Sequence, residues 1–249
     1  MPSSTPSSIP TASAVTENLH PKTGQPVGAV VDGKPAAHPG PVTLAGRFGR
    51  IEKLKSGHAP SLWDAVKGED RIWTYMPSYG PFPNAAAFSA WAATRAEFDD
   101  PYSYAIIDAA SRAIGVFALM AIRPEHRVIE VGHVVYSPTL QRTPLATEAQ
   151  YLLARYAFET LGYRRYEWKC DALNAASNRA AKRYGFTFEG IFRQHMIGKG
   201  RSRDTAWYAM LDTEWSARKA NFERWLAPDN FTAEGRQIQS LSQLNSTTE

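Results

Sequence analysis

The sequence predicts a mixed α/β (α+β) fold, in which a central, mostly antiparallel twisted sheet is flanked by helices. The first observation is the order of apolar patterns, which is αα, βββ, α, β, α, ββ after an opening strand. The second is the short, turn-like segments between consecutive strands, which favour antiparallel neighbours. The third is a composition of 43% hydrophobic and 21% charged residues, typical of a globular chain with a core. At 249 residues we expect one domain with loose ends.

Three regions follow from composition along the chain. Residues 1–41 are rich in Ser, Thr, Pro, Ala and Gly and contain no aromatic residue, so we expect a disordered tail. Residues 42–227 form the predicted domain, which ends in a docking helix at 213–226 with Trp215, Phe222 and Trp225 at helical spacing. Residues 228–249 are polar and are expected to form a second tail.

The first half of the domain begins with a strand or strand pair at 42–55 and a short helix at 59–67. A helix is then predicted from Asn84, an N-cap candidate, through Phe98. Three strands come next, separated by the turn-like segments 108–112 and 123–127. Their predicted ranges are 102–107, 114–122 and 128–136.

The second half returns to helical spacing after Ser137 and Pro138 and stops at Gly162. A strand at 165–170 and a helix at 174–184, ended by Gly185, continue the alternation. Strands at 188–197 and 205–211 follow, and the basic segment 198–204 between them is most simply a hairpin turn.

Charge and cysteine content narrow the function classes. The net charge is +4, but no run of five or six basic residues occurs, so a nucleic-acid partner has little support. A single cysteine, Cys170, excludes an intrachain disulfide and any multi-cysteine metal site. The start of the chain lacks a signal-peptide pattern, and no apolar stretch approaches the roughly 18 residues of a membrane helix. We therefore expect a cytoplasmic protein without a membrane partner, as a monomer or homodimer.

The most informative stretch is a buried strand that leads directly into a helix. The strand covers residues 130–136, and residues 141–149 begin the helix. The first-turn amides of such a helix lack intrahelical partners, and together with the helix dipole they suit a pyrophosphate. An ordinary helix that begins at Pro144 explains the same pattern equally well. This segment alone leaves both interpretations open.

Two blocks make the pattern specific. With Gln141 and Ala146, the first resembles the acyl-CoA motif of the GCN5-related N-acetyltransferase superfamily, although Pro144 replaces the family's first Gly and removes one amide donor. The run Ala-Thr-Glu-Ala at 146–149 resembles the subgroup that includes the ribosomal-protein N-terminal acetyltransferases. The second block, at 174–186, resembles the family's Asn, helix and terminal Gly-Phe. The resemblance covers roughly residues 42–215.

The resemblance implies acetyl-CoA as cosubstrate, no metal or redox cofactor, and a sheet whose central strands are splayed at the acyl-CoA site. It places the cofactor against three parts of the chain. These are the strand 130–136, the segment from Gln141 to the start of the helix, which we call the phosphate loop, and the start of the block 174–186. The cofactor-binding residues that it implies are Val134, Val135, Tyr136, Gln141, Arg142, Thr143, Leu145, Ala146, Thr147 and Asn174.

Amine acetylation needs a base to remove a proton from the acceptor. Glu130 lies between Ile129 and Val131, so we expect a partly desolvated carboxylate with a raised pKa, although an exposed Glu with an ordinary pKa fits equally. His133 is the second candidate, and strict alternation places it on the opposite face unless a bulge intervenes.

The resemblance gives Ser177 the role of the acid that protonates the leaving thiolate, although a helix-capping Ser is an equal interpretation. The family's Tyr position is occupied here by Ala181. Tyr184 lies where the family usually has an aliphatic residue, so we expect it to pack in the core.

The aromatic and Pro-rich loop 73–83 resembles the segment that covers the acceptor site in the subgroup, and it fits a simple hydrophobic lid equally well. We expect an acetyl-CoA-dependent N-acetyltransferase that acts by direct attack of a primary amine, with a small-molecule amine preferred to a protein N-terminus. The alternative is a non-catalytic acyl-CoA-binding module of the same fold, which Pro144 and Ala181 support.

Overall fold

The computed structural model describes residues 18–246, and the chain divides into two units, residues 1–34 and 35–249. In the first unit, β1 (Asn18–Leu19) pairs antiparallel with β2 (Pro26–Val27). Residues 1–17 of the expected N-terminal tail lie outside the described residues. The described part of that tail contains the β1–β2 pair, and the tail boundary at residue 41 stays a prediction.

The second unit is built on an eight-stranded sheet with the order β3-β4-β5-β6-β7-β8-β10-β9. All neighbours are antiparallel except β7 and β8, which are parallel. The predicted mixed, mostly antiparallel sheet is confirmed. Its strands are β3 (Thr43–Ala45), β4 (Gly49–Lys53), β5 (Tyr102–Asp108), β6 (Ala113–Arg123), β7 (Val128–Tyr136), β8 (Arg165–Asp171), β9 (Thr187–Gly198) and β10 (Arg201–Leu211).

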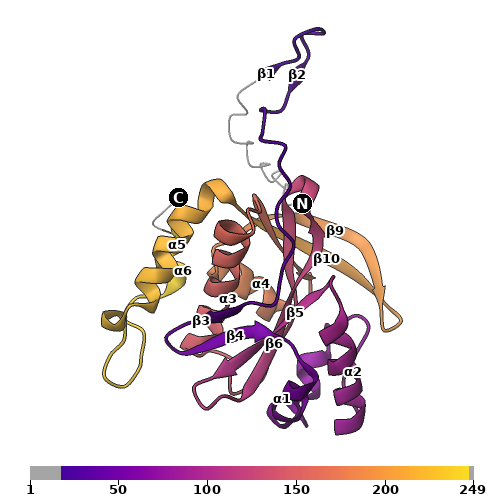
Figure 1. The fold of residues 1–249 in the computed structure, drawn as a ribbon, viewed down its shortest axis with the longest axis vertical. Helices are drawn as coiled ribbons and strands as arrows, with labels where there is room; N and C mark the ends of the chain where they lie inside the picture. Colours follow the sequence, from indigo (N-terminus) through magenta and orange to yellow (C-terminus); the bar gives the residue numbers. More distant parts are fainter. Residues whose placement is uncertain (1–17, 247–249) are drawn as a thin grey trace, which may run out of the picture. The chain divides into compact units, whose positions relative to one another are not determined.

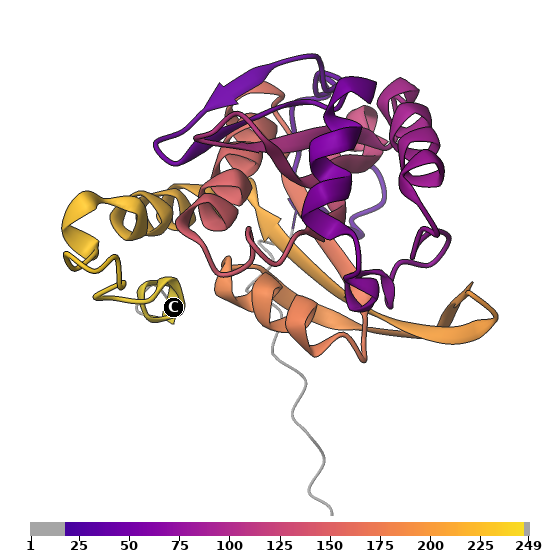
Figure 2. The same cartoon turned by 90° about the horizontal axis from the view of Figure 1, so that it is seen from below.

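Helices cover both faces of this sheet, and Figures 1 and 2 show α1 and α2 together on one side and α3, α5 and α6 on the other. On the first side, which we call the α1/α2 face, Leu62 and Phe88 pack with Val116 and Val135. The other side, the α3 face, holds the larger core. The helices are α1 (Ala59–Val66), α2 (Ala85–Glu97), α3 (Pro144–Arg155), α4 (Ala175–Arg183), α5 (Asp212–Leu226) and α6 (Leu241–Ser246).

The hairpin of β9 and β10 is longer than the sequence pattern indicated. We expected a turn over 198–204, but β9 continues to Gly198 and β10 begins at Arg201. Only Lys199 and Gly200 form the turn, and both have positive φ (49° and 73°). A two-residue turn of this kind is the usual hairpin connection, so the basic residues that follow it belong to the strand.

The segment expected as a polar C-terminal tail packs onto the domain as far as it is described. Leu241 and Leu244 of α6 are buried, and Asn245 Nδ2 donates a hydrogen bond to the Arg183 carbonyl oxygen (2.9 Å). The spacing of these two leucines places both on one side of a helix turn, which faces the core. Residues 247–249 lie outside the described residues.

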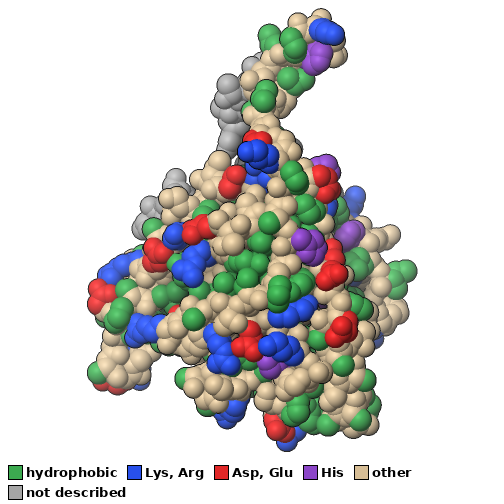
Figure 3. Space-filling view, viewed as in Figure 1, with side chains coloured by type: hydrophobic (Ala, Val, Ile, Leu, Met, Phe, Trp, Pro, Cys, Tyr) green, Lys and Arg blue, Asp and Glu red, His purple; other side chains and the backbone are tan. Residues whose placement is uncertain are grey.

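Two surface observations bear on partners. In the part of the chain that the structure describes, no helix has both the length and the apolar character needed to cross a bilayer. In Figure 3, Lys and Arg side chains lie interspersed with Asp and Glu over the visible face.

The start of α3 is set by its own sequence and by a contact with the β3–β4 turn. Thr143 is the N-cap, with its Oγ1 accepting a hydrogen bond from the Ala146 amide (3.2 Å), and Pro144 is the first helical residue. One turn later, the buried Glu148 carboxylate accepts the amides of Arg47 (2.6 Å) and Phe48 (2.8 Å). Glu148 therefore joins α3 to the edge of the sheet.

Replacement of Glu148 by Ala is expected to lower the free energy of unfolding by about 2–3 kcal/mol, because two amides lose a charged acceptor. Urea unfolding checks this value. The exposed Glu97 at the end of α2 provides the control, and Glu97→Ala should change stability by less than about 0.5 kcal/mol. Equal losses in the two variants would show that the turn contact contributes little.

Candidate active site

The two central strands separate halfway along their length. β7 and β8 are paired from Val128–Arg165 to Val131–Trp168, and the pairing ends there. Beyond this point β7 pairs only with β6, whereas β8 pairs with β10 up to Asp171–Thr205. The splayed strands expected from the sequence are present. Backbone groups of residues 132–136 that point away from β6 are thus left without a strand partner.

A bulge in β7 reorients His133. Val116 pairs with Val135 and Ala118 pairs with Gly132, so two residues of β7 lie opposite the single residue between them on β6. His133, one of these two, has a left-handed φ of 51°. Its Nδ1 lies 2.8 Å from the Tyr79 hydroxyl, on the α1/α2 face. The bulge in β7 that the sequence pattern left undecided is therefore present.

Glu130 lies on the same face. Its register partner is Met120, and an ideal Cβ on the neighbouring Gly132 would lie 2.4 Å from Met120 Sδ and 3.4 Å from Glu130 Oε1. The two candidate bases therefore share one face of β7, contrary to the expectation from strict alternation. No side chain fits at Gly132 without displacing Met120, and the glycine keeps this part of the site open.

The structure buries Glu130 at 6% exposure, which excludes the alternative of a solvent-exposed carboxylate. Burial raises the pKa of Glu130 above its usual range, and Lys169, whose Nζ donates to Oε2 at 2.9 Å, acts against that rise. Oε1 has no hydrogen-bond partner among the described residues. Glu130 thus combines a raised pKa with one available oxygen, as the base role requires.

Lys169 and Glu167 on β8 complete this cluster, and neither was predicted from the sequence as a site residue. Lys169 Nζ also pairs with Glu167 (2.8 Å), which Arg165 (2.7 Å) and Arg123 (3.0 Å) bind in turn. Although burial raises the pKa of Glu167, the hydrogen bonds from Lys169 and Arg165 hold it below its usual range. Alternation along the strand could have identified them, because Glu167 and Lys169 are two residues apart and therefore lie on one face of the strand next to Glu130.

His133 is held in its neutral form. Burial first, and the nearby charge of Arg95 second, lower the pKa of His133 to about 4. Its ring also lies against that of Tyr79, with 5.6 Å between centroids. At neutral pH, His133 is therefore an uncharged imidazole facing the loop between α1 and α2.

The depressed pKa of His133 predicts a loss of stability in acid. Because the folded pKa (about 4) lies below the unfolded value of 6.5, the contribution is complete above pH 6.5 and is lost as pH falls towards 4. The full difference corresponds to about 3 kcal/mol. The free energy of unfolding in urea, measured between pH 4 and 7, should therefore decrease less in acid for His133→Gln than for the parent chain.

Glu130 makes the opposite contribution, since its raised pKa favours folding as pH falls. The comparison of His133→Gln with the parent chain cancels that contribution. A variant curve parallel to the parent curve would show that His133 titrates normally.

The loop before α3 carries the residues expected to hold the pyrophosphate. Gln141 is exposed, and its Nε2 donates to the Tyr136 carbonyl oxygen (2.9 Å), so it closes the loop back onto β7. Arg142 is exposed and has a left-handed φ of 62°. Leu145 and Ala146 are buried against the core. Their side chains are therefore structural, and only their backbone is available to a ligand.

The set of available amides is smaller than expected. The Thr143 amide donates to the Leu140 carbonyl oxygen (3.3 Å) and the Ala146 amide to the Thr143 hydroxyl. Thr147 is the fourth residue of α3, where the amide bonds within the helix. Among the described residues, the amides of Arg142 and Leu145 have no partner in the chain. An anion at this position thus meets two amides and the helix dipole.

The backbone of residues 134–136 lines the splay, as the resemblance implied. The side chains of Val134 and Tyr136 pack on the α3 face, whereas Val135 is buried on the α1/α2 face. The Tyr136 hydroxyl accepts a hydrogen bond from Gln150 Nε2 (2.9 Å), which ties the end of β7 to α3. Side chains on both faces therefore hold this backbone in place.

Asn174 and Ser177 lie at the start of α4, where the structure gives them local partners. Asn174 is the N-cap, and its Oδ1 accepts the Ser177 amide at 3.1 Å. Ser177 Oγ accepts the Trp168 indole N–H (2.9 Å), and the Ser177 hydroxyl also hydrogen-bonds the buried Cys170 thiol. The side-chain oxygen of Asn174 thus caps α4, while its Nδ2 has no partner among residues 18–246.

Two neighbours explain the arrangement of the second block. Tyr184 is buried and stacks on Phe222 at 6.2 Å, so its predicted packing role is confirmed, and Ala181 is fully buried. Asn178, which was not among the residues predicted from the sequence, donates to the Asn174 carbonyl oxygen (2.9 Å) and accepts a hydrogen bond from the Tyr208 hydroxyl (2.7 Å). This residue holds the loop between β8 and α4.

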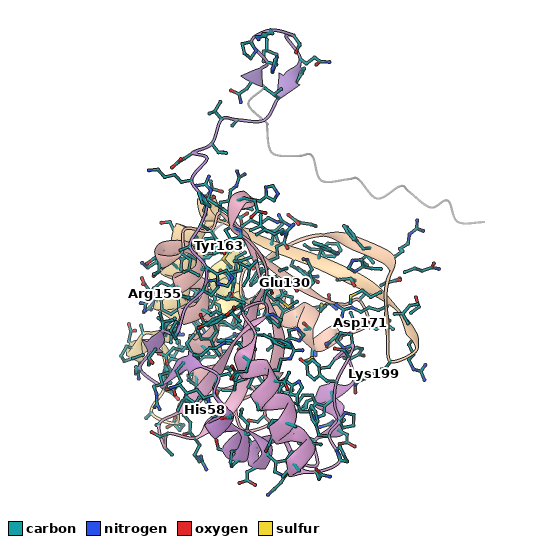
Figure 4. All side chains as sticks on the ribbon, turned by 45° about the vertical axis from the view of Figure 1, so that its right-hand side comes forward. His58, Glu130, Arg155, Tyr163, Asp171 and Lys199 are labelled. Atoms are coloured by element: carbon teal, nitrogen blue, oxygen red, sulfur yellow. The ribbon has the colours of Figure 1, made fainter. Side chains whose placement is uncertain are left out.

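The aromatic loop 73–83 is attached on both sides of the splay, because Tyr79 contacts His133 on β7 and further bonds reach the side of β8 and the β9–β10 hairpin. The Tyr75 hydroxyl donates to the Leu173 carbonyl oxygen (3.2 Å), next to Asn174. Lys199 Nζ, at the β9–β10 turn, donates to the carbonyl oxygens of Trp73 (2.8 Å) and Gly80 (2.6 Å). Figure 4 labels Lys199 at this turn and Glu130 in the interior. The loop therefore bridges β8 and the hairpin over the α1/α2 face.

A family model and two curated proteins match this chain. The model, described as an acetyltransferase (GNAT) domain, matches residues 50–187. The uncharacterized N-acetyltransferase YoaA of Bacillus subtilis (strain 168) is 33% identical over 98 residues, which is 39% of this chain and 55% of that protein. The uncharacterized N-acetyltransferase YnaD of the same organism is 33% identical over 88 residues, 35% and 51% of the two chains. The chain spans about half the length of these curated relatives.

Solved structures match over more of the chain. A GCN5-related N-acetyltransferase from Brucella melitensis is 43% identical, with a TM-score of 0.83 over 86% of this chain and 98% of that chain. The ribosomal L7/L12 alpha-N-protein acetyltransferase RimL is 21% identical, with a TM-score of 0.58 over 68% and 94%. At that identity, the second match supports the fold alone.

Proposed function

Because the chain belongs to the GNAT acetyltransferase family, we propose that it is an N-acetyltransferase that moves an acetyl group from acetyl-CoA to a primary amine. The observation that carries the proposal is the splay of β7 and β8 with the buried Glu130 carboxylate on the adjoining face. An unpaired strand edge, a helix N-terminus and a base thus lie along one strand-to-helix segment.

The residues present fit acetyl-CoA. The free amides of Arg142 and Leu145 at the start of α3 suit its pyrophosphate, and the unpaired edge of residues 134–136 suits the extended arm. Asn174 Nδ2 is available to the same arm from the start of α4. Acetyl-CoA supplies the acetyl group as a thioester.

Glu130 is the base in this proposal. An amine attacks only when it is uncharged, so its proton must pass to a nearby acceptor before or during attack. The available Glu130 Oε1 takes that proton, and a carboxylate of raised pKa holds it better than an exposed one. His133 is the second candidate, since its neutral imidazole lies on the same face and its Nδ1 is engaged by Tyr79.

Ser177 is the acid in this proposal. As the new C–N bond forms and the C–S bond breaks, the departing sulfur becomes negatively charged and needs a proton. The Trp168 indole occupies only a lone pair of Oγ, so the Ser177 hydrogen can turn from the Cys170 thiol to the departing sulfur. The indole N–H also stabilises negative charge on that oxygen after it donates.

For the acceptor, we propose a small-molecule amine rather than a protein N-terminus. The loop 73–83 is bonded to His133 on β7 and to Leu173 after β8, on either side of the splay, which narrows the approach to the α1/α2 face. The cytoplasmic location, the monomer or homodimer state and the absence of nucleic-acid, membrane and metal partners stay predictions.

Release of free CoA tests the proposal. The full chain is incubated with acetyl-CoA and a panel of primary amines, while calorimetry measures acetyl-CoA binding separately. We expect binding together with amine-dependent thiol release. Binding without thiol release for any amine would instead support the non-catalytic acyl-CoA-binding module.

A further inference from the structure

Beside Glu130, the α1/α2 face carries an aromatic surface that the proposed chemistry does not use. Its members, which we call the aromatic platform, are Phe192 and His195 on β9 and Trp207 on β10. The Phe192 and Trp207 ring centroids are 4.5 Å apart at 32°, and the His195 ring stands edge-on to both at 5.5 and 5.9 Å. Such a set of rings is a surface suited to a further ring.

The platform is exposed rather than part of the core. Phe192 is 51% exposed, His195 is exposed and Trp207 is half-buried. The Trp207 indole N–H is buried and has no hydrogen-bond partner in the described part of the chain. A buried donor without an acceptor is costly, so a ligand atom there would satisfy it.

Lys169 connects the platform to the proposed base. Its Nζ lies 3.9 Å from the Trp207 ring centroid and 2.9 Å from Glu130 Oε2. Only the Lys169 side chain therefore separates a molecule on the platform from the Glu130 carboxylate, the proposed base.

Charged side chains of both signs lie near the platform. Both buried carboxylates, Glu130 and Glu167, are already paired with Lys169, and Glu167 also binds Arg165. Arg203 donates through Nε only to the Thr205 hydroxyl (3.2 Å) and has no carboxylate partner among residues 18–246. Asp171, the register partner of Thr205, has no ion-pair partner among residues 18–246 either, so side chains of both signs lie beside the platform.

Resting on the proposed N-acetyltransferase function, we infer that the acceptor is a primary amine carried on a flat aromatic body, whose ring packs on the exposed ring of Phe192 and touches the open edge of Trp207. The ring lies on the platform while the amine reaches Glu130 Oε1.

A matched substrate series tests the inference. Phenethylamine and tryptamine are compared with hexylamine and spermidine by free-thiol release from acetyl-CoA. We expect kcat/KM for the aromatic amines to be at least about tenfold higher, since two ring contacts contribute together. Equal or better use of hexylamine or spermidine would overturn the inference while leaving the proposed function intact. Release with no amine would overturn both.

Two variants locate the effect. Phe192→Leu and Trp207→Leu should each lower kcat/KM for tryptamine roughly 2- to 10-fold, mainly through KM, with little change for hexylamine. Phe192 is exposed, so its replacement leaves folding intact even if the Trp207 variant is unstable. The control is Phe188→Leu, an exposed ring on the same strand, which pairs with Tyr208 on the opposite face.

The competing occupant of the platform is a second copy of the chain. Sedimentation of the parent chain and of Phe192→Leu distinguishes the two. We expect the same oligomeric state for both and a loss of aromatic preference in the variant. A dimer that dissociates on substitution, with the substrate preference unchanged, would overturn the inference.

Discussion

Glu130→Gln is expected to lower kcat for amine acetylation by roughly 100- to 10,000-fold, the usual contribution of a positioned base. The amide keeps the shape of the carboxyl group and its contact with Lys169 but cannot take a proton. Because Glu130 lies on the α1/α2 face and the phosphate loop lies at the other end of β7, the Kd for acetyl-CoA should change by less than about threefold. Steady-state kinetics and calorimetry measure the two quantities.

The pH profile adds an independent check on the same variant. Because burial raises the pKa of Glu130, kcat/KM of the parent chain should decrease as the pH is lowered, and this acid limb of the profile should lie above pH 4.5. Glu130→Gln should lose that limb, whereas Glu125→Gln, on the exposed turn before β7, should keep both rate and profile. If the Glu130→Gln variant kept the parent's rate and limb, His133 or a water chain would be the base instead.

Arg142→Glu is expected to weaken acetyl-CoA binding by roughly 10- to 100-fold. Arg142 is exposed next to the free amides at the start of α3, so a carboxylate at this position opposes the pyrophosphate in the field of the helix N-terminus. The fold should be unaffected, as both side chains are exposed and polar. Calorimetry at two salt concentrations measures the loss, which should shrink as salt screens the repulsion.

The control for this substitution is Arg142→Gln, which keeps the backbone conformation and removes only the positive charge. We expect it to bind acetyl-CoA within about fivefold of the parent chain. Leu145 and Ala146 are unsuitable for this test, because their buried side chains would report on folding. If Arg142→Glu bound acetyl-CoA as tightly as the parent chain, the pyrophosphate site would have to lie elsewhere.

Local chemistry explains why most elements could be predicted from the sequence. Asn84 caps the start of α2, and Gly185, with a left-handed φ of 89°, follows the end of α4. Both residue types favour these backbone positions, so the sequence alone indicated where α2 begins and where α4 ends. Thr143 and Pro144 likewise specify the start of α3 without help from distant contacts. The predicted order of strands and helices is therefore confirmed across the domain.

Features that depend on distant residues could not be predicted in this way. The bulge that turns His133 towards Tyr79 depends on the pairing of β7 with β6, which alternation within one strand does not reveal. Lys169 reaches Glu130 only because β7 and β8 are adjacent and parallel. The packing of α6 depends on contacts of Leu241 and Asn245 with helices far earlier in the chain, so composition alone indicated a tail.

The most direct test of acetyl transfer is mass spectrometry of the acceptor itself, with free CoA measured in the same reaction. With acetyl-CoA, tryptamine and the full chain, we expect N-acetylated amine and free CoA in equal amounts, and formation of both at least about 100-fold slower with Glu130→Gln. Free CoA without acetylated amine would show thioester hydrolysis and would contradict the account, as would bound acetyl-CoA that yields no product with any amine.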